Sequence, residues 1–186
     1  AVIAVSGELV GRAREIGVAA ERVEQIPNGV DCDLFRPGTR IPGENGWRLV
    51  YLGRYDPAKG LNELLQAMAG LRAEGRDVHL DLVGGGATDL PNDFPAIAAQ
   101  LGISDRVCFI DEVPWRELPD VLHTADVFVL PSHSEGLPLS LLEALACGLP
   151  VVTTRCGGPE EVVNDAVGRL AEPRDVAGLQ AALATT

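Results

Sequence analysis

The feature that most constrains this chain is an alternation of short apolar runs with segments of helical periodicity. The apolar runs are nearly continuous and rich in β-branched residues, which is typical of strands buried on both faces of a parallel sheet. We expect strands at residues 2–5, 48–52, 78–83, 106–110, 127–130 and 150–153. Strands that alternate with helices through short loops predict an α/β fold with a doubly wound, Rossmann-like parallel sheet.

Two segments between the expected strands carry clear apolar stripes of helical spacing. The stripes consist of Leu61, Leu64, Leu65, Met68 and Leu71 in one segment, and of Leu141, Leu142, Leu145 and Ala146 in the other. Ser6 is expected to cap the first helix and Gly17 to end it. Pro114, Pro138 and Pro159 are each expected in the first turn of a helix.

Composition excludes several classes of protein. The 186 residues fit one ordinary domain, and 27 acidic against 15 basic side chains give a formal net charge of −12. A chain of this charge repels nucleic acid and acidic membrane surfaces, so any bound anion requires a local basic pocket. The sequence has no apolar run of 18 residues, and its start has neither an initiator Met nor a basic region typical of a secretory signal. The start is interpreted as a strand cut from a longer protein, and the Gly- and Pro-rich segment 36–47 as a surface loop.

The cysteines and the lysine content are also informative. Cys32, Cys108, Cys147 and Cys156 lack the spacing of a metal site, which favours reduced, mostly buried thiols in a cytoplasmic protein and indicates no bound metal. Lys59 is the only lysine among the 15 basic residues. A GC-rich genome explains why lysine is scarce, but it does not explain the place of the one that remains.

The predicted architecture indicates where a ligand binds. In open parallel sheets, ligands lie beyond the carboxyl ends of the strands, where the strand order reverses. The loops that follow the expected strands are therefore the candidates for the site: 53–60, 84–90, 111–114, 131–138 and 154–159.

The loop GRYDPAKG at 53–60 brings Arg54 and Lys59 into one short turn. A guanidinium fork beside an ammonium group suits a pyrophosphate. The alternative, that both are solvated surface charges, is usually right for a single basic residue. It is weakened here because the only lysine falls in a predicted ligand loop of an acidic protein.

The loop VGGGATD at 83–89 resembles a dinucleotide fingerprint only superficially. Gly84 and Gly86 form a G-x-G, but Asp89 occupies the third glycine position, and no Walker A lysine follows. A Rossmann oxidoreductase is therefore disfavoured. These glycines either turn the chain or let a ligand approach the backbone of Gly84 closely.

The segment PSHSEGLPLSLLEALACGLPVV at 131–152 carries the most information. A helix that starts near Pro138 has free amide groups at Leu139 and Ser140, which favour an anion. The carboxylate of Glu143 lies one to two turns into this helix and is able to accept two hydrogen bonds from a ribose diol. Glu135 lies farther out. The alternative for Glu143 is a solvent-facing position, although apolar neighbours on both sides favour a partner for it.

The motifs together resemble those of retaining GT-B glycosyltransferases of the GT4 type. The resemblance rests on E-x7-E from Glu135 to Glu143, EALACGLPVV, Gly157-Gly158, PNGVD at 27–31 followed by Phe35 and Pro37, GR…KG at 53–60, and ADVFVLPS at 125–132. Each motif is weak alone, but they occur in the family's order over nearly the whole chain.

The resemblance implies a role for each candidate residue in binding a nucleotide diphosphate sugar. It places Arg54 and Lys59 on the diphosphate, Glu143 on the ribose and Glu135 by the sugar, so that Arg54, Lys59 and Glu135 act in catalysis. The amides after Gly136, those of Leu137, Leu139 and Ser140, fall near sugar and phosphate. Gly84 falls at the donor site, and Glu112-Val113 touches the base.

This sequence departs from the family pattern at two places. Asp111 stands where the family often has Gly, which leaves the base contacts open. Leu137-Pro138 replaces the commoner Phe-Gly, which bears on sugar selectivity and suits a helix start.

The resemblance covers only the donor half of such enzymes. Residues 1–186 are therefore expected to form one donor-binding domain, the C-terminal half of a GT-B fold, with the acceptor-binding domain outside this chain. The donor is a UDP-, GDP- or ADP-sugar; no cofactor or metal is implied, and nucleic acid is not a partner. The acceptor, a glycan or lipid, is reached through the other domain, and contact of that domain with the cytosolic membrane face stays open. The isolated chain is expected to bind donor without transferring sugar. A rival interpretation is a non-catalytic sensor of nucleotide sugars or phospholigands.

Overall fold

A six-stranded parallel sheet forms the centre of the molecule, with the strand order β5-β4-β3-β6-β7-β8. The computed structural model describes residues 1–38, 46–85 and 93–186. The strands are β3 (Trp47–Leu52), β4 (Val78–Val83), β5 (Val107–Ile110), β6 (Val127–Leu130), β7 (Val151–Thr154) and β8 (Gly168–Ala171). The chain runs outward from β3 to β5 and then returns to the other side of β3, so the order reverses between β3 and β6.

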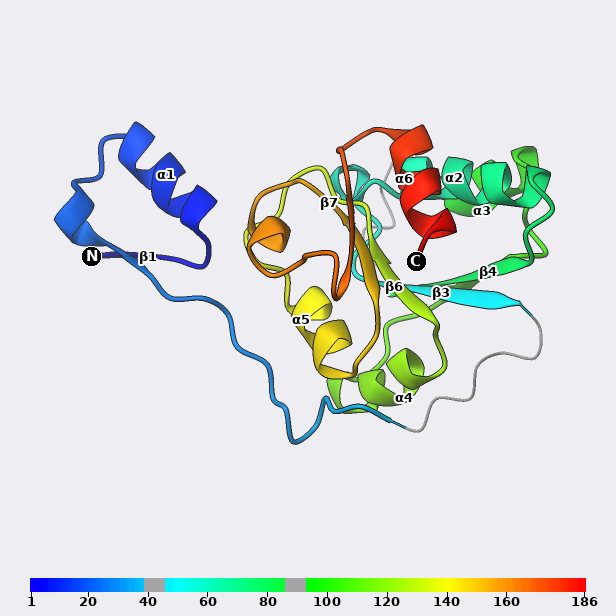
Figure 1. The fold of residues 1–186 in the computed structure, drawn as a ribbon, viewed down its shortest axis with the longest axis horizontal. Coiled ribbons are helices and arrows are strands. Elements are labelled where there is room, and N and C mark those ends of the chain that lie inside the picture. Colours follow the sequence, from blue (N-terminus) through cyan, green and yellow to red (C-terminus); the bar gives the residue numbers. More distant parts are fainter. Residues whose placement is uncertain (39–45, 86–92) are drawn as a thin grey trace.

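Helices cover both faces of this sheet, which confirms the predicted doubly wound α/β fold. Figure 1 shows α2 (Leu61–Ala73), α3 (Phe94–Gln100) and α6 (Val176–Ala184) on one face, and α4 (Leu118–His123) and α5 (Leu139–Ala146) on the other. The predicted stripe on α2 is confirmed, because all five of its residues are buried. On α5 the buried face differs from the predicted stripe: it contains Leu141, Ala144 and Glu143, while Leu142 and Leu145 are half-buried.

The first residues form a separate unit, seen beside the main body in Figure 1. It consists of β1 (Val2–Ala4), α1 (Gly7–Glu15) and β2 (Val23–Gln25), and its two parallel strands pair only with each other within the described chain. Ser6 caps α1 by accepting a hydrogen bond from the amide of Leu9 at 3.4 Å, as predicted. Gly17 follows the end of that helix with a positive φ of 90°. The expected strand at 2–5 therefore exists but does not join the central sheet.

Two strands escape prediction because neither carries an apolar run. β2 has the sequence VEQ, and β8 has the sequence GRLA and lies at the sheet edge, where only one side of the strand has a hydrogen-bonded neighbour.

The three prolines mark starts of helical turns within one residue: Pro159 lies in the 3₁₀ turn Gly158–Glu161, Pro114 directly precedes the 3₁₀ turn Trp115–Glu117, and Pro138 directly precedes α5. Most of the predicted loop 36–47 lies outside the described residues, and Trp47, its last residue, already belongs to β3.

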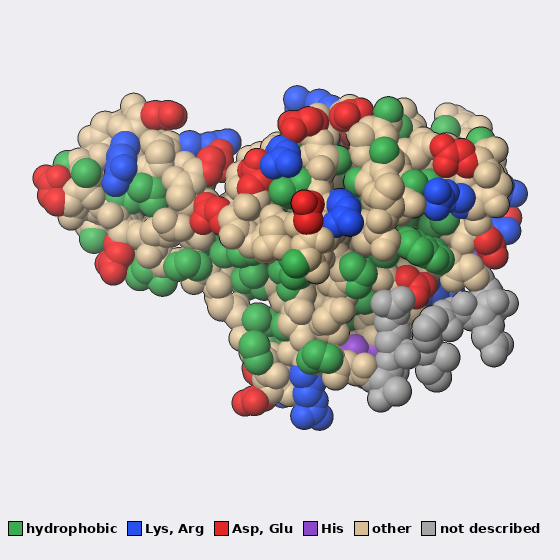
Figure 2. All heavy atoms as spheres, in the orientation of Figure 1, with side chains coloured by type: hydrophobic (Ala, Val, Ile, Leu, Met, Phe, Trp, Pro, Cys, Tyr) green, Lys and Arg blue, Asp and Glu red, His purple; other side chains and the backbone are tan. Residues whose placement is uncertain are grey.

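The surface and the cysteines complete this description. Acidic and basic side chains are interspersed on the face that Figure 2 shows. Cys147 and Cys156 are buried, but Cys32 and Cys108 are exposed, so the expectation of mostly buried thiols is wrong for two of the four. No helix in the described ranges has the length and apolarity required to cross a membrane.

Candidate functional site

A buried tyrosine of β3 holds the loop that follows this strand. The hydroxyl of Tyr51 donates a hydrogen bond to the carbonyl oxygen of Arg54 at 2.7 Å. Burial, and next the nearby charge of Glu135, raise the pKa of Tyr51 far above its ordinary value, so the phenol stays a neutral donor. Asp56 caps the 3₁₀ turn Pro57–Lys59 through the amide of Ala58 at 2.8 Å. These bonds fix the backbone between Arg54, which is exposed, and Lys59.

The structure brings Lys59 and Glu135 into direct contact. Their side chains form an ion pair at 2.7 Å, with 22% of the lysine and 11% of the glutamate side chain exposed. Lys59 follows β3 and Glu135 follows β6, so the pair spans the two neighbouring strands at which the sheet order reverses. This is the place where a doubly wound sheet is expected to bind its ligand.

Further bonds fasten the loop that carries Glu135. Nε2 of His133 donates a hydrogen bond to the carboxylate of Glu63 on α2 at 3.0 Å, and both side chains are largely buried. The amide of Glu135 donates to the carbonyl of Cys156 at 2.9 Å, and its own carbonyl accepts from the amide of Gly158 at 3.2 Å. The backbone that presents Glu135 is therefore held by α2 on one side and by the loop after β7 on the other.

Four of the predicted residues, Arg54, Gly84, Glu112 and Val113, line one hollow. The hollow has a volume of about 250 Å³ at the carboxyl ends of β3, β4 and β5. It is lined by Leu52, Gly53, Arg54, Val83, Gly84, Gly85, Glu112, Val113 and Leu118. Gly84 has a φ of 130°, and a Cβ atom built on it lies 2.1 Å from the carbonyl oxygen of Gly53. Glycine is therefore required there for the two loops to touch. Gly86 and Asp89 lie outside the described residues.

Glu143 is buried instead of facing solvent. Only 7% of the residue is exposed, and its Oε1 accepts a hydrogen bond from Nε1 of Trp115 at 2.9 Å. Burial raises the pKa of Glu143 above its ordinary value, and the bond from Trp115 partly opposes that rise. The indole ring of Trp115 packs against Phe35 at a centroid distance of 5.5 Å. The predicted partner of Glu143 is thus an aromatic N–H group, from a residue that the sequence motifs did not single out.

The start of α5 and the residues before it form the remaining part of the candidate site. Leu139 is exposed and Ser140 is half-buried, and no side chain within the described residues caps this helix. Leu137 is buried, and its carbonyl oxygen accepts a hydrogen bond from Asn28 at 2.6 Å. Gly136 lies against Gly158 so closely that a Cβ atom on Gly158 would stand 1.3 Å from the Gly136 carbonyl oxygen.

The N-terminal unit touches the same region. Both carboxylate oxygens of Glu161 are used: one accepts from the amide of Gly7 at 2.6 Å, and the other accepts from the side chain of Gln25 at 3.0 Å. Asn28 belongs to the PNGVD motif, so its bond to Leu137 gives that motif a structural role. Sequence reasoning missed Glu161, because nothing local distinguishes it from the adjacent Glu160.

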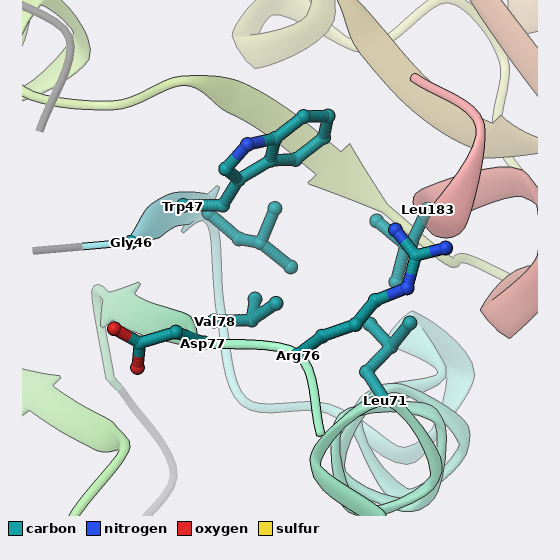
Figure 3. Close-up of a pocket in the computed structure, with 8 residues that line it drawn as sticks. Gly46, Trp47, Leu71, Arg76, Asp77, Val78 and Leu183 are labelled. Atoms are coloured by element: carbon teal, nitrogen blue, oxygen red, sulfur yellow. The ribbon is translucent and has the colours of Figure 1, made fainter. Parts of the chain in front are cut away.

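A different hollow lies at the opposite, amino end of the sheet (Figure 3). Its volume is about 290 Å³, and its lining is Gly46, Trp47, Leu49, Leu71, Arg76, Asp77, Val78 and Leu183. The apolar side chains of β3, β4, α2 and α6 dominate this lining. Its lining contains none of the predicted site residues. It lies at the end of the sheet opposite to the loops that follow β3 and β6.

Comparison with known proteins identifies the family. The pattern of the family described as glycosyl transferases group 1 matches residues 39–185. This chain belongs to the glycosyltransferase group 1 family. The resemblance to GT4 glycosyltransferases of the retaining GT-B type is thereby confirmed.

Individual relatives agree with this assignment. The group 1 domain is 37% identical over 182 residues to a D-inositol 3-phosphate glycosyltransferase of Geodermatophilus obscurus, with 90% of this chain and 40% of that protein covered. Sucrose-phosphate synthase of Thermosynechococcus elongatus superposes with a TM-score of 0.90 at 28% identity, covering 99% of this chain and 48% of the other. Anabaena Alr3699/HepE in complex with UDP-glucose gives a TM-score of 0.88 at 26% identity, covering 99% and 53%. The group 1 domain thus spans about half the length of these proteins, or less.

Proposed function

We propose that this chain is the donor half of a retaining glycosyltransferase and binds a nucleotide diphosphate sugar. The observation that carries the proposal is the ion pair of Lys59 and Glu135 across the strand reversal, at the same carboxyl edge of the sheet as the hollow that Arg54 lines. A basic pair within an acidic protein provides the local positive charge that a diphosphate needs. The crystal structure of the Anabaena relative in complex with UDP-glucose supports the same class of ligand.

Each part of the site takes one part of the donor. Arg54 and Lys59 bind the diphosphate, together with the amides of Leu139 and Ser140 at the start of α5. The hollow between Gly84 and Val113 takes the base, in which the Glu112-Val113 segment makes the contact. Glu143 binds the ribose hydroxyls. Glu135 and the segment from Gly136 to Leu137 face the sugar, and the base itself is that of UDP, GDP or ADP.

The chemistry follows from where charge develops. The bond between the anomeric carbon and the diphosphate oxygen breaks, the acceptor oxygen forms the new bond to that carbon, and the proton of the acceptor hydroxyl passes to the departing diphosphate. Negative charge grows on the departing diphosphate. Arg54 and Lys59 lie on a loop whose backbone is held by Tyr51 and Asp56, and their positive charges stabilise that developing charge. The carboxylate of Glu135 lies beside Lys59 and is placed for the sugar end of the donor.

The acceptor belongs to another part of such a protein. This chain spans 40% of the length of the Geodermatophilus relative, and we propose that groups outside it hold the glycan or lipid acceptor. Residues 1–186 then act as one donor-binding domain, which by itself binds donor but transfers no sugar. Without a bound acceptor, the two reactants are never held together.

The test is a calorimetric screen of this chain with UDP, GDP and ADP, each beside its nucleoside. One diphosphate should bind, raise the melting temperature and bind far more tightly than the nucleoside. A matched assay with the corresponding nucleotide sugar and a simple glycoside should detect no transfer by this chain. If no diphosphate binds, the proposed function is wrong. Robust transfer by this chain alone would contradict the assignment of the acceptor to another part of the protein.

A further inference from the structure

The strongest unexplained feature near the site is the contact between Trp115 and Glu143. Trp115 stands two residues after Val113, which lines the hollow, and 46% of it is exposed. With that exposure, a large aromatic side chain contributes little to the packing of the core. Its indole N–H nevertheless donates to the buried carboxylate of Glu143 at 2.9 Å.

The indole also packs against a second aromatic ring. Its ring lies beside Phe35 at a centroid distance of 5.5 Å and an interplanar angle of 57°, and Phe35 is fully buried. Phe35 follows the PNGVD segment, whereas Trp115 follows β5 and Glu143 lies on α5. Three distant parts of the chain therefore meet around the indole of Trp115, which holds one carboxylate oxygen of Glu143.

The chemistry of this contact suits a carboxylate that has to bind a neutral ligand. An indole is a donor only, and a carboxylate has about four acceptor sites on its two oxygens. The bond from Trp115 uses one acceptor site on Oε1 and does not involve Oε2. Because the indole is uncharged, this bond does not neutralise the carboxylate. A basic residue at the same place would hold the carboxylate in an ion pair and compete with hydroxyl groups for it.

We propose that Trp115 is the positioning residue for Glu143, whose carboxylate it orients to accept the ribose hydroxyls of the donor nucleotide. This rests on the proposed function, since it takes Glu143 as the ribose-binding group. Trp115 itself acts through Glu143 and is not required to touch the ligand.

The electrostatics of Glu143 give the proposal a distinctive pH dependence. Burial raises the pKa of Glu143, and the bond from Trp115 lowers it. A titratable neighbour of Glu143 is Cys147, one turn further along the chain, where burial and then the charge of Glu143 raise the thiol pKa to about 11. Cys147 therefore stays neutral. Loss of the indole N–H should raise the pKa of Glu143 further. On acidification, nucleotide affinity should therefore begin to fall at a higher pH than in the unaltered chain.

The central experiment uses Trp115→Phe, which keeps a ring against Phe35 and removes only the N–H donor. Calorimetry measures the dissociation constants of UDP and GDP and of their 2′-deoxy forms, from mildly acidic to neutral pH. In the unaltered chain the ribonucleotide should bind about three- to tenfold more tightly than the deoxynucleotide. In Trp115→Phe this ratio should approach one, and the loss of affinity in acid should begin at a higher pH. The matched control is Trp47→Phe, at the amino end of the sheet, which should leave both properties unchanged.

Glu143→Gln separates this proposal from the function on which it rests. If Glu143→Gln leaves the ribo-to-deoxy ratio unchanged, then Glu143 does not bind ribose and its assigned role fails. If Glu143→Gln abolishes the ratio while Trp115→Phe retains both the ratio and the pH profile of the unaltered chain, the positioning role alone is overturned.

A spectroscopic measurement covers the case in which Trp115→Phe does not fold. The sequence has two tryptophans, so Trp115 is the only one left in Trp47→Phe. Its emission should titrate with Glu143 and shift when the diphosphate binds, and Glu143→Gln in the same background should abolish the titration. An emission that ignores both acid and nucleotide would overturn the proposal.

Discussion

Glu135 and Glu143 lie eight residues apart on one segment, yet the fold gives them opposite surroundings. Glu135 sits in a loop, pairs with the ammonium group of Lys59 at 2.7 Å and keeps a charged partner. Glu143 sits in α5, is 7% exposed and receives the neutral N–H of Trp115. The apolar setting of Glu143 raises the pKa of its carboxyl above the ordinary value.

The difference shows how one segment serves two parts of a ligand. Lys59 is already paired with Glu135, so an arriving diphosphate has to share the ammonium group with that carboxylate. Glu143 has no such charged competitor within the described residues and is fixed in orientation by a helix and an indole. We therefore expect substitutions in the first pair to change the response to phosphate charge, and those in the second to change the response to ribose.

The largest effect is expected for Lys59→Ala. The variant loses a charge-assisted contact and leaves the carboxylate of Glu135 facing the diphosphate alone. Nucleoside diphosphate affinity should fall about ten- to a hundredfold, with little change for the nucleoside. Calorimetry with both ligands measures this, and Arg54→Ala should show the same selectivity. Because part of the loss is repulsion by Glu135, the double variant with Glu135→Gln should recover some of it. Equal losses for diphosphate and nucleoside would show that the two basic residues do not contact phosphate.

A somewhat smaller effect is expected for Glu143→Gln. The substitution keeps the shape and an acceptor for Trp115 but removes the charge that strengthens bonds to the ribose diol. Every nucleoside diphosphate should bind about three- to tenfold more weakly, with or without an attached sugar. Nucleosides should lose affinity by a similar factor, in contrast to Lys59→Ala. An undiminished affinity for all these ligands would leave Glu143 as a buried helix residue without a role in binding.

The features that could be predicted from the sequence are those that depend on residues close together along the chain. Local signals were sufficient for the α2 stripe and for Ser6 at the start of α1, because spacing and capping are set within one or two turns. The placement of Lys59 and Glu135 in loops at the carboxyl ends of strands also followed, because a parallel sheet binds its ligand at that edge. Their direct ion pair did not follow, because side-chain pairing across 76 positions depends on the detailed loop geometry.

The residues that sequence reasoning missed act over longer distances. Trp115 was close to the segment at Glu112-Val113 but was not singled out, because its partners are Glu143 and Phe35, which lie 28 and 80 positions away along the chain. β8 was missed because a four-residue edge strand with Gly and Arg has no apolar run to identify it. An aromatic N–H donor beside a predicted ligand loop is the local signal that was present for Trp115, although it does not name the acceptor.

A more selective effect is expected for Glu135→Gln. The change frees Lys59 from its counter-ion, so the bare diphosphate should bind as tightly as before, or a few-fold more tightly. The sugar nucleotide should bind more weakly, because the group that faces the sugar loses its charge. Calorimetry with UDP against UDP-glucose, or with the pair that the nucleotide screen selects, measures the contrast. The two glutamates would lose their distinct roles if Glu135→Gln harmed the bare diphosphate as much as Glu143→Gln does.

The smallest expected effect concerns stability against pH, and its sign separates folding from binding. Burial raises the pKa of Glu143 in the folded chain, so the folded state binds a proton more readily than the unfolded state. The contribution of this group to the free energy of unfolding should therefore be largest below the ordinary glutamate pKa and should fall as pH rises through the raised folded value. Nucleotide binding should change in the opposite direction over the same window, since the ionised carboxylate accepts the ribose hydroxyls. Urea unfolding measures the free energy of unfolding of both the unaltered chain and Glu143→Gln across this pH window. The part of the pH dependence that comes from Glu143 should be missing in Glu143→Gln. A stability difference between the two chains that stays constant with pH would mean that Glu143 titrates as it does in water, and the contrast with Glu135 would then rest on geometry alone.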